Sequence, residues 1–142
     1  HSCRCTPDQI HRYQSKLSGP LMDRIDLHVD VPSLPNADLL GASAGEATEH
    51  IRERCAQARN RAVERQGCSN MALQGQAIEQ HILLDGDAVK FLNVAATRLG
   101  WSARGTHRAL KVARTIADLA GSHHTQVAHL AEAMQYRRTL TR

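Results

Sequence analysis

The sequence predicts an all-α fold, a helical bundle preceded by a largely unstructured remnant of an α/β core, and three observations predict it. Only four of the 142 residues are aromatic, so Leu, Ile, Val and Ala must build the core, which favours packed helices over a sandwich or barrel. Apolar residues recur with helical spacing from about residue 46 onward. Residues 25–31, IDLHVDV, alternate with the period of two that is typical of a half-buried strand, but one strand cannot form a sheet alone.

The N-terminal part begins with a helix that the sequence caps. Thr6 is the predicted N-cap, Pro7 the first helical residue and Gln9 the partner of Thr6 in a capping box. The helix should end by about Leu17, before a Gly-Pro turn. Because the strand that follows has no partner, we expect residues 3–32 to be partly or wholly disordered.

Composition divides the chain into three parts. Residues 1–35 read as a broken α/β piece, residues 36–45 as a linker of proline, glycine and small residues, and residues 46–140 as a helical domain. The chain starts at His1 without an initiator methionine, so we expect it to be a piece of a longer protein.

The first helix of the helical domain is predicted to begin at a capping box of Ser43 and Glu46 and to end near Gly67. Its apolar stripe consists of four residues: Ile51, Cys55, Ala58 and Ala62. A short helix over residues 74–83 should follow, with Ile78 and Ile82 on its buried face.

Three capped helices complete the predicted bundle. Asp85 caps the first, which Gly100 closes, Ser102 caps the second, which ends near Ala120, and Thr125 caps the last. The first of them should face inward with Val89, Leu92, Ala96 and Leu99. The last should do so with Val127, Leu130, Ala131 and Met134.

The charged residues favour arginine. The formal net charge is +4, with 18 Lys and Arg against 14 Asp and Glu, and only Lys16, Lys90 and Lys111 are lysines. Arginine suits phosphates, so this bias indicates either a phosphate-bearing partner or a solvated basic surface. No P-loop, glycine-rich phosphate cradle or Ser/His/Asp order is present, which excludes a complete enzyme of those kinds.

Arg24 is the first candidate site residue. It lies at the start of the predicted strand, so it should project from the end of a sheet. Its guanidinium could pair with Asp23 or Asp26, which is the structural interpretation. Alternatively, it could reach across an interface to a phosphate and stabilise transition-state charge there.

The helix after Ser102 carries the second candidate. One face collects five polar residues: Arg104, His107, Arg108, Lys111 and Arg114. The other face is apolar and indicates core packing: Ala109, Val112, Ala113, Ile116 and Ala120. Arg104 lies near the second helical position, where the helix dipole disfavours a cation by roughly a few tenths of a kcal/mol or more. A bound anion or a neighbouring carboxylate would relieve this.

Metal binding has two weak candidates. His124 and His129 are five residues apart, which does not align two ligands on a helix, so these residues and His123 are better read as solvated histidines. Cys3 and Cys5 would supply two of the four ligands that a structural zinc site needs.

Two long motifs resemble a known family. CRCTPDQIHRY followed by LSGPLMDRIDLHVDVP is similar to the end of the ATPase core of the magnesium-chelatase-like AAA+ ATPases of the ComM/YifB competence-protein family. LGWSARGTHRALKVARTIADLAGS followed by HLAEAMQYR is similar to their C-terminal helical domain. The resemblance covers nearly the whole chain and implies that the helical domain is the AAA+ lid.

The resemblance also implies residue roles. Arg24 matches the arginine finger, which enters the ATP site of the neighbouring subunit in a homo-hexameric ring. Arg104 matches sensor 2, which contacts the γ-phosphate of ATP on its own core, with Arg108 as a further nucleotide-binding residue. Cys3 and Cys5 are similar to the second half of a zinc-binding insertion whose first half is absent here.

For the full-length protein, the resemblance implies ATP and Mg²⁺ as cofactors, DNA as a partner, and a cytoplasmic motor that remodels DNA during competence and recombination, by helicase action or branch migration. The Walker A, Walker B and sensor 1 motifs would lie before His1. We therefore expect the chain alone to be a monomer that neither binds ATP tightly nor hydrolyses it. No apolar run reaches the roughly 18 residues of a membrane span.

An alternative from another class is a basic helical module that binds nucleic acid directly. It would use Arg52, Arg59 and Arg61 on one helix, or Arg108, Lys111 and Arg114 on another. Such binding would be non-specific and steeply dependent on salt.

Overall fold

The computed structural model describes residues 4–16, 18–22, 24–33 and 45–137. Its elements, in chain order, are α1 (Pro7–Gln14), α2 (Gly19–Met22), α4 (Thr48–Gln66), η1 (Asn70–Ala72), α5 (Gln76–Ile82), α6 (Gly86–Leu99), α7 (Ala103–Leu119) and α8 (Val127–Gln135). These described residues contain no strand, and the helical domain folds as the predicted bundle of α4 to α8. The all-α class is confirmed.

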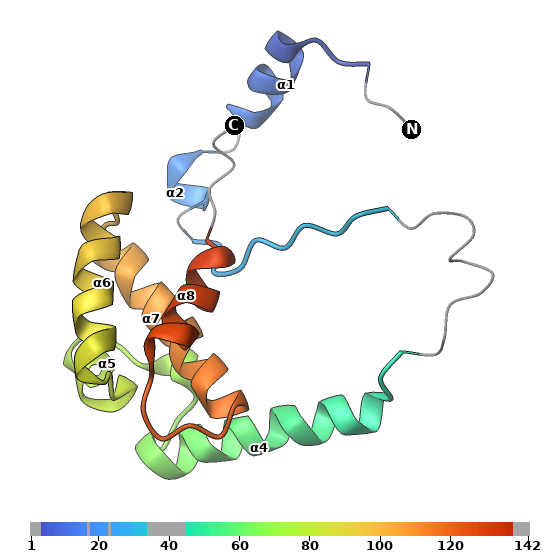
Figure 1. Cartoon of the computed structure of the whole chain (residues 1–142). Coiled ribbons are helices and arrows are strands. Elements are labelled where there is room, and N and C mark those ends of the chain that lie inside the picture. Colours follow the sequence, from blue (N-terminus) through green and yellow to red (C-terminus); the bar gives the residue numbers. More distant parts are fainter. Residues whose placement is uncertain (1–3, 17, 23, 34–44, 138–142) are drawn as a thin grey trace.

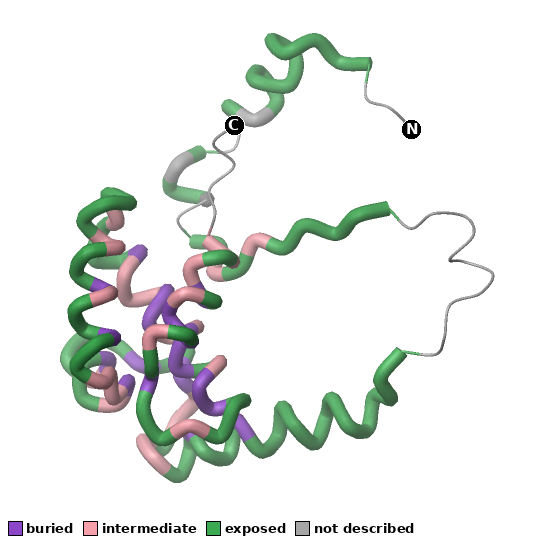
Figure 2. The backbone as a smooth tube through the Cα atoms, viewed as in Figure 1, coloured by how far each residue is buried: buried purple, intermediate pink, exposed green. Residues whose placement is uncertain are grey.

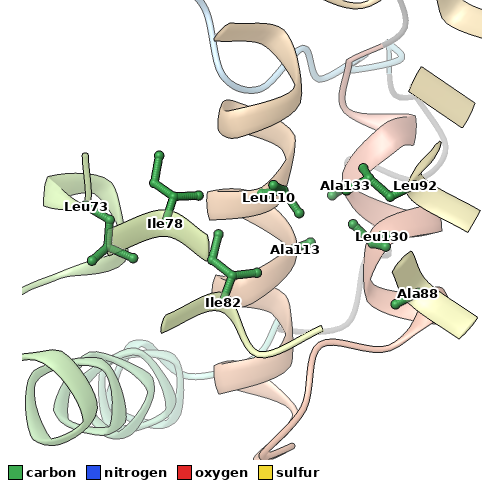
Figure 3. Close-up of a cluster of buried hydrophobic side chains, with 9 residues drawn as sticks. All are labelled: Leu73, Ile78, Ile82, Ala88, Leu92, Leu110, Ala113, Leu130 and Ala133. Carbon is green, nitrogen blue, oxygen red and sulfur yellow. The ribbon is translucent and has the colours of Figure 1, made fainter. Parts of the chain in front are cut away.

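Helix α7 is the central element of the bundle (Figure 1), because α8, α4, α5 and η1 all pack against it. Small residues make this possible: Ala109, Ala113 and Ala117 recur every four residues along α7 and are completely buried. Alanine on the inner face lets neighbouring helices approach closely. Figure 3 shows the surrounding aliphatic cluster: Leu73, Ile78, Ile82, Ala88, Leu92, Leu110, Ala113, Leu130 and Ala133.

Helix ends agree with the sequence where a specific residue determines them. Asp85 accepts a hydrogen bond from the Ala88 amide at 2.8 Å, and Ser102 accepts one from the Gly105 amide at 3.1 Å. Gly67 ends α4 and Gly100 ends α6, with φ of 75° and 60°, in the left-handed region that favours glycine.

The predicted start of α4 is wrong. The helix begins at Thr48 with Ala47 as N-cap and no side-chain capping bond, and Ser43 lies outside the described residues. Glu46 instead forms a forked ion pair with Arg54, at 2.7 and 3.0 Å. A carboxylate accepts two bonds from a guanidinium more strongly than one from a backbone amide, which explains the change.

The predicted apolar stripe of α4 is only half correct. Ala58 and Ala62 are buried, whereas Ile51 is 40% exposed and Cys55 is also exposed. Figure 2 shows the reason: only the C-terminal half of α4 lies against the bundle, and its N-terminal half extends away from it.

Two further details of the bundle differ from the prediction. Helix α6 buries Ala88 and Leu92, but Val89 and Leu99 are exposed, because α6 lies on the outside of the bundle and its contact face is narrow. The N-cap of α8 is Gln126 rather than Thr125. Thr125 is buried, donates a hydrogen bond to the Ile82 carbonyl at 2.6 Å and accepts one from Arg114 Nη1 at 3.3 Å, so its hydroxyl bonds these groups and not the α8 amides.

The N-terminal part contains helices α1 and α2 followed by extended chain. The Thr6–Gln9 capping box is present, with bonds of 2.9 and 3.3 Å, although α1 ends at Gln14, earlier than expected. Residues 25–31 form no strand and run as extended chain (Figure 1), as expected for a segment with a strand pattern but no neighbouring strands. How far residues 3–32 are disordered in solution stays a prediction.

The extended residues present the side of the chain opposite to that expected of a half-buried strand. Ile25, Leu27 and Val29 are 38%, 49% and 65% exposed, whereas Asp26 and His28 are half-buried against the helical domain. Within the described residues, no helix is both long and apolar enough to cross a membrane.

Candidate functional site

The N-terminal turn of α7 holds the strongest candidate site residue. Arg104 is the second residue of α7 and is exposed, and its side chain makes no hydrogen bond or ion pair with another described residue. The amides of the first helical turn lack intrahelical partners and carry a partial positive charge. An unpaired cation there is unfavourable, and an anion that contacted both the guanidinium and the helix end would remove the repulsion.

A second arginine lies against the same turn. The Arg137 guanidinium lies over the Trp101 ring at 5.7 Å from its centroid, and a methyl group on Gly105 would lie 3.5 Å from Arg137 Nη2. Trp101 immediately precedes the N-cap of α7, so this cation–π contact holds Arg137 at the end of α7 that carries Arg104. Nothing in the sequence pointed to Arg137, because its proximity depends on how α8 returns to α7.

One turn further along α7, Arg108 forms an ion pair with the extended N-terminal segment. Its Nε lies 3.1 Å from Asp26 Oδ1, and the two side chains are 24% and 37% exposed. The His28 amide donates to the Tyr136 carbonyl just after α8, at 2.7 Å. Residues 26–28 therefore dock against both α7 and α8.

Arg24 lies two residues before this ion pair. It is exposed, follows α2, and its backbone amide donates to the Leu21 carbonyl at 3.0 Å. Asp26, one of its two expected structural partners, is instead paired with Arg108. Asp23, the other, lies outside the described residues. The structure thus brings the segment that carries Arg24 to the end of α7 that carries Arg104.

The prediction that Arg114 lies on the polar face of α7 is wrong, because its side chain is buried. Its guanidinium donates to the Ser122 and His123 carbonyls, at 2.6 and 2.8 Å, and to Asp118 at 2.9 Å. The same carboxylate accepts a bond from Arg65 at 2.7 Å. The i,i+4 spacing of Arg114 and Asp118 could have predicted their ion pair. The ion pair between Arg65 and Asp118 could not be predicted from spacing, because the two residues lie on different helices.

The surroundings of Asp118 favour its charged, deprotonated state. Burial alone would raise the pKa of Asp118, but hydrogen bonds from Arg65 and Asn70 and the charge of Arg114 outweigh it, so the pKa of Asp118 is lowered. Burial lowers the pKa of Arg114, and Asp118 opposes that effect. Arginine stays charged because its ordinary pKa is so high.

The metal candidates stand apart from this region. His129 is buried and accepts a hydrogen bond from the Gln126 amide at 3.0 Å, while His123 and His124 form an edge-to-face ring pair. No group of three or more potential metal ligands occurs among the described residues. Cys5 is exposed and Cys3 lies outside the described residues, so zinc binding by this pair stays a prediction.

The two basic sets of the nucleic-acid alternative differ in their surroundings. On α4, Arg52 and Arg59 are exposed, whereas Arg61 donates to the Asp118 carbonyl at 2.7 Å. On α7, Lys111 donates to the Met71 carbonyl at 3.0 Å. Together with the burial of Arg114 and the ion pair of Arg108, this leaves the α7 set engaged within the protein.

Comparison with known proteins gives a consistent result. Residues 45–137 match the family model described as magnesium chelatase, subunit ChlI C-terminal, and residues 1–39 match that described as magnesium chelatase, subunit ChlI. Competence protein ComM of Haemophilus influenzae is 43% identical over 135 residues, which cover 94% of this chain and 26% of that protein.

Two other relatives also match nearly the whole chain. Uncharacterized protein YifB of Escherichia coli is 40% identical over 94% of this chain and 27% of its own length. An uncharacterized protein of Mycobacterium tuberculosis is 36% identical over 96% of this chain and 28% of its own length. The chain spans about a quarter of the length of the curated relatives it matches.

Proposed function

The chain belongs to the magnesium chelatase ChlI family, and from that premise we propose that it is the C-terminal part of an AAA+ ATPase. In this proposal the helical domain of α4 to α8 is the lid over the nucleotide. Arg104 acts as sensor 2 on the γ-phosphate of ATP bound to its own core, and Arg24 acts as the arginine finger for the neighbouring subunit of a homo-hexameric ring.

The observation that carries the proposal is the environment of Arg104. A cation at the second residue of α7, exposed and without a partner among the described residues, costs stability and has no structural role in the bundle. The terminal phosphate of a nucleotide supplies the anion that this position lacks. Arg24 is also exposed, as a residue that acts across a subunit interface must be.

In this proposal the rest of the ATP site would lie in parts of the protein outside this chain. Walker A, Walker B and Mg²⁺ would supply the phosphate cradle and neutralise the developing charge, and Arg24 would add positive charge at the transferred phosphoryl group. The exposed apolar side chains Ile25, Leu27 and Val29 suit a strand that is buried by the remainder of an α/β core.

Two substitutions in the full-length protein test this proposal. Arg24→Ala should bind ATP as the wild type does and lose turnover by roughly 10³-fold or more, the magnitude typical of an arginine finger. Arg104→Ala should weaken ATP binding, turnover or both. Arg98→Ala, at an exposed arginine in the last turn of α6, is the matched control and should change neither. Wild-type turnover in both Arg24→Ala and Arg104→Ala would contradict the proposal.

We propose that the ATPase acts on DNA. The name of ComM as a competence protein supports a role in the processing of incoming DNA, by helicase action or branch migration. Arg52 and Arg59, seven residues apart and both exposed on α4, are placed to contact phosphates. A basic module that binds DNA without any nucleotide role would use the same residues, and the ATPase test above separates the two functions.

A further inference from the structure

The extended segment after α2 contacts the helical domain with its polar side. Asp26 and His28 are half-buried there, and the apolar side chains that alternate with them are more exposed. A contact that selects the polar side of an amphipathic segment is not made by hydrophobic burial. It depends on the Asp26–Arg108 ion pair at 3.1 Å and the His28–Tyr136 backbone hydrogen bond at 2.7 Å.

The position of this ion pair relates two arginines that are far apart in sequence. Asp26 follows Arg24 by two residues in the chain. Arg108 follows Arg104 by four residues on α7, so the two lie on the same face of the helix, one turn apart. The Asp26–Arg108 ion pair and the His28–Tyr136 hydrogen bond thus link the segment that carries Arg24 to α7 and to the end of α8.

We propose that the Asp26–Arg108 ion pair is a positioning contact that couples nucleotide sensing at Arg104 to the placement of Arg24. The inference rests on the function proposed above. When Arg104 engages the terminal phosphate in its own subunit, α7 moves with it, and Arg108 moves Asp26 and hence Arg24 toward the next site of the ring. Hydrolysis at one site then depends on nucleotide at the preceding one.

The environment of the pair suits this role. The side chains of Arg108 and Asp26 are 24% and 37% exposed, whereas the side chains of Glu46 and Arg54 at the start of α4 are 44% and 52% exposed. Removal of part of the water strengthens the attraction between the charges.

The test is a charge swap in the full-length protein. Asp26→Arg places two arginines opposite each other and should lower turnover at saturating ATP by roughly 2- to 30-fold, the range in which single residues alter coupling. It should also lower the Hill coefficient for ATP while KM stays near the wild-type value. Combining Asp26→Arg with Arg108→Asp restores the pair in reverse and should recover both turnover and cooperativity.

The matched control is the exposed pair on α4. Glu46→Arg should leave turnover and cooperativity unchanged, because the Glu46–Arg54 ion pair lies at the exposed start of α4. A second readout is independent of activity: Asp26→Asn should accelerate hydrogen exchange of the His28 amide while the buried turns of α7 keep their protection.

The outcomes separate this inference from the proposed function. If Arg24→Ala and Arg104→Ala abolish turnover but the Asp26 variants behave as the wild type, the inference is overturned and the proposed function remains. If the swap fails to recover turnover and raises KM, Arg108 contacts nucleotide directly and the coupling role is overturned. If Arg24→Ala and Arg104→Ala turn over normally, both the proposed function and the coupling inference are contradicted.

Discussion

Arg65 and Arg114 meet the Asp118 carboxylate in the interior of the helical domain, where Asp118 is 1% exposed. Asn70 donates to the same carboxylate at 2.8 Å, so α4, η1 and α7 are joined at one side chain. Two arginines around one buried acid are stable only while that acid is charged, because otherwise the guanidinium groups lack a counter-charge.

We therefore expect Asp118→Asn to lower the free energy of unfolding by about 3 kcal/mol or more at neutral pH, because it leaves the buried Arg114 and the partly buried Arg65 without a counter-charge. Urea denaturation measures this. Asp87→Asn makes the same change in an exposed pair with Lys90 and should cost only about 1 kcal/mol, because the ion pair is exposed and the charge lies in the first turn of α6. Equal effects of the two substitutions would show that the buried group contributes no more than the exposed pair.

The same residue gives a prediction for pH. The pKa of Asp118 is lowered in the folded state, and an unfolded aspartate titrates at about 3.9. The stability that the folded carboxylate contributes is therefore fully present above about pH 4 and is lost as the pH falls from there through the lowered folded pKa.

Acidification should thus narrow the stability gap between the wild type and Asp118→Asn, since only the wild type loses this contribution. Urea midpoints of both proteins at pH 7 and at successively lower pH values below about 4 measure the gap. A gap that stays constant over this range would contradict the assigned role of Asp118.

Sequence reasoning at the residue scale located the exposed arginines but missed the buried ones. A helical wheel puts Arg114 with Arg104 and Arg108, because it records only angular position. Whether an arginine at that angle faces water or the returning chain at residues 122–125 depends on the path of a loop. That information is not contained in the spacing of residues on one helix.

At the scale of single elements, helix ends were more predictable than helix faces. Asp85, Ser102, Gly67 and Gly100 determine boundaries by local backbone chemistry, and the structure agrees at each of them. Faces depend on which neighbours reach a helix. The predicted apolar stripe of α4 includes Ile51, but only the half of that helix near Ala58 has a neighbour.

Capping of α7 gives a prediction at this scale. Ser102→Ala removes the hydrogen bond to the Gly105 amide and should lower the free energy of unfolding by about 1 kcal/mol. Ser69→Ala is the matched control, because Ser69 precedes η1 without any side-chain capping bond. Thermal denaturation of both variants checks this, and similar melting temperatures would contradict it.

Helix α4 gives a second prediction at the scale of an element, which concerns DNA. Replacing Arg52 and Arg59 by alanine should weaken binding to duplex DNA and reduce the slope of log K against log salt by about 1 for each phosphate that an arginine no longer neutralises. Fluorescence anisotropy over a salt series measures the slope. Arg98→Ala on α6 should leave the slope unchanged, and an equal loss in all variants would argue against a DNA-binding face on α4.

At the scale of the whole molecule, α7 connects stability and proposed function. Its buried alanines and Asp118 hold the bundle together, while its first two turns carry Arg104 and contact the Arg24 segment through Arg108. A rigid helix with one anchored end is suited to transmit the state of a bound nucleotide. The bundle itself was predictable from periodicity, whereas the docking of residues 26–28 onto it was not, because it buries polar rather than apolar side chains.

The central claim is that Arg104 serves the ATP site of its own subunit and Arg24 that of the next, and mixing two inactive variants of the full-length protein tests it most directly. In rings assembled from equal amounts of Arg24→Ala and Arg104→Ala subunits, an Arg24→Ala subunit followed by an Arg104→Ala subunit forms an intact site. Random mixing makes about a quarter of the sites intact. We predict ATP turnover above that of either variant alone and at most about a quarter of the wild-type rate, because the finger of each intact site comes from a subunit that lacks Arg104 and its coupling. Turnover no higher than that of the separate variants would show that the two arginines do not act in adjacent subunits.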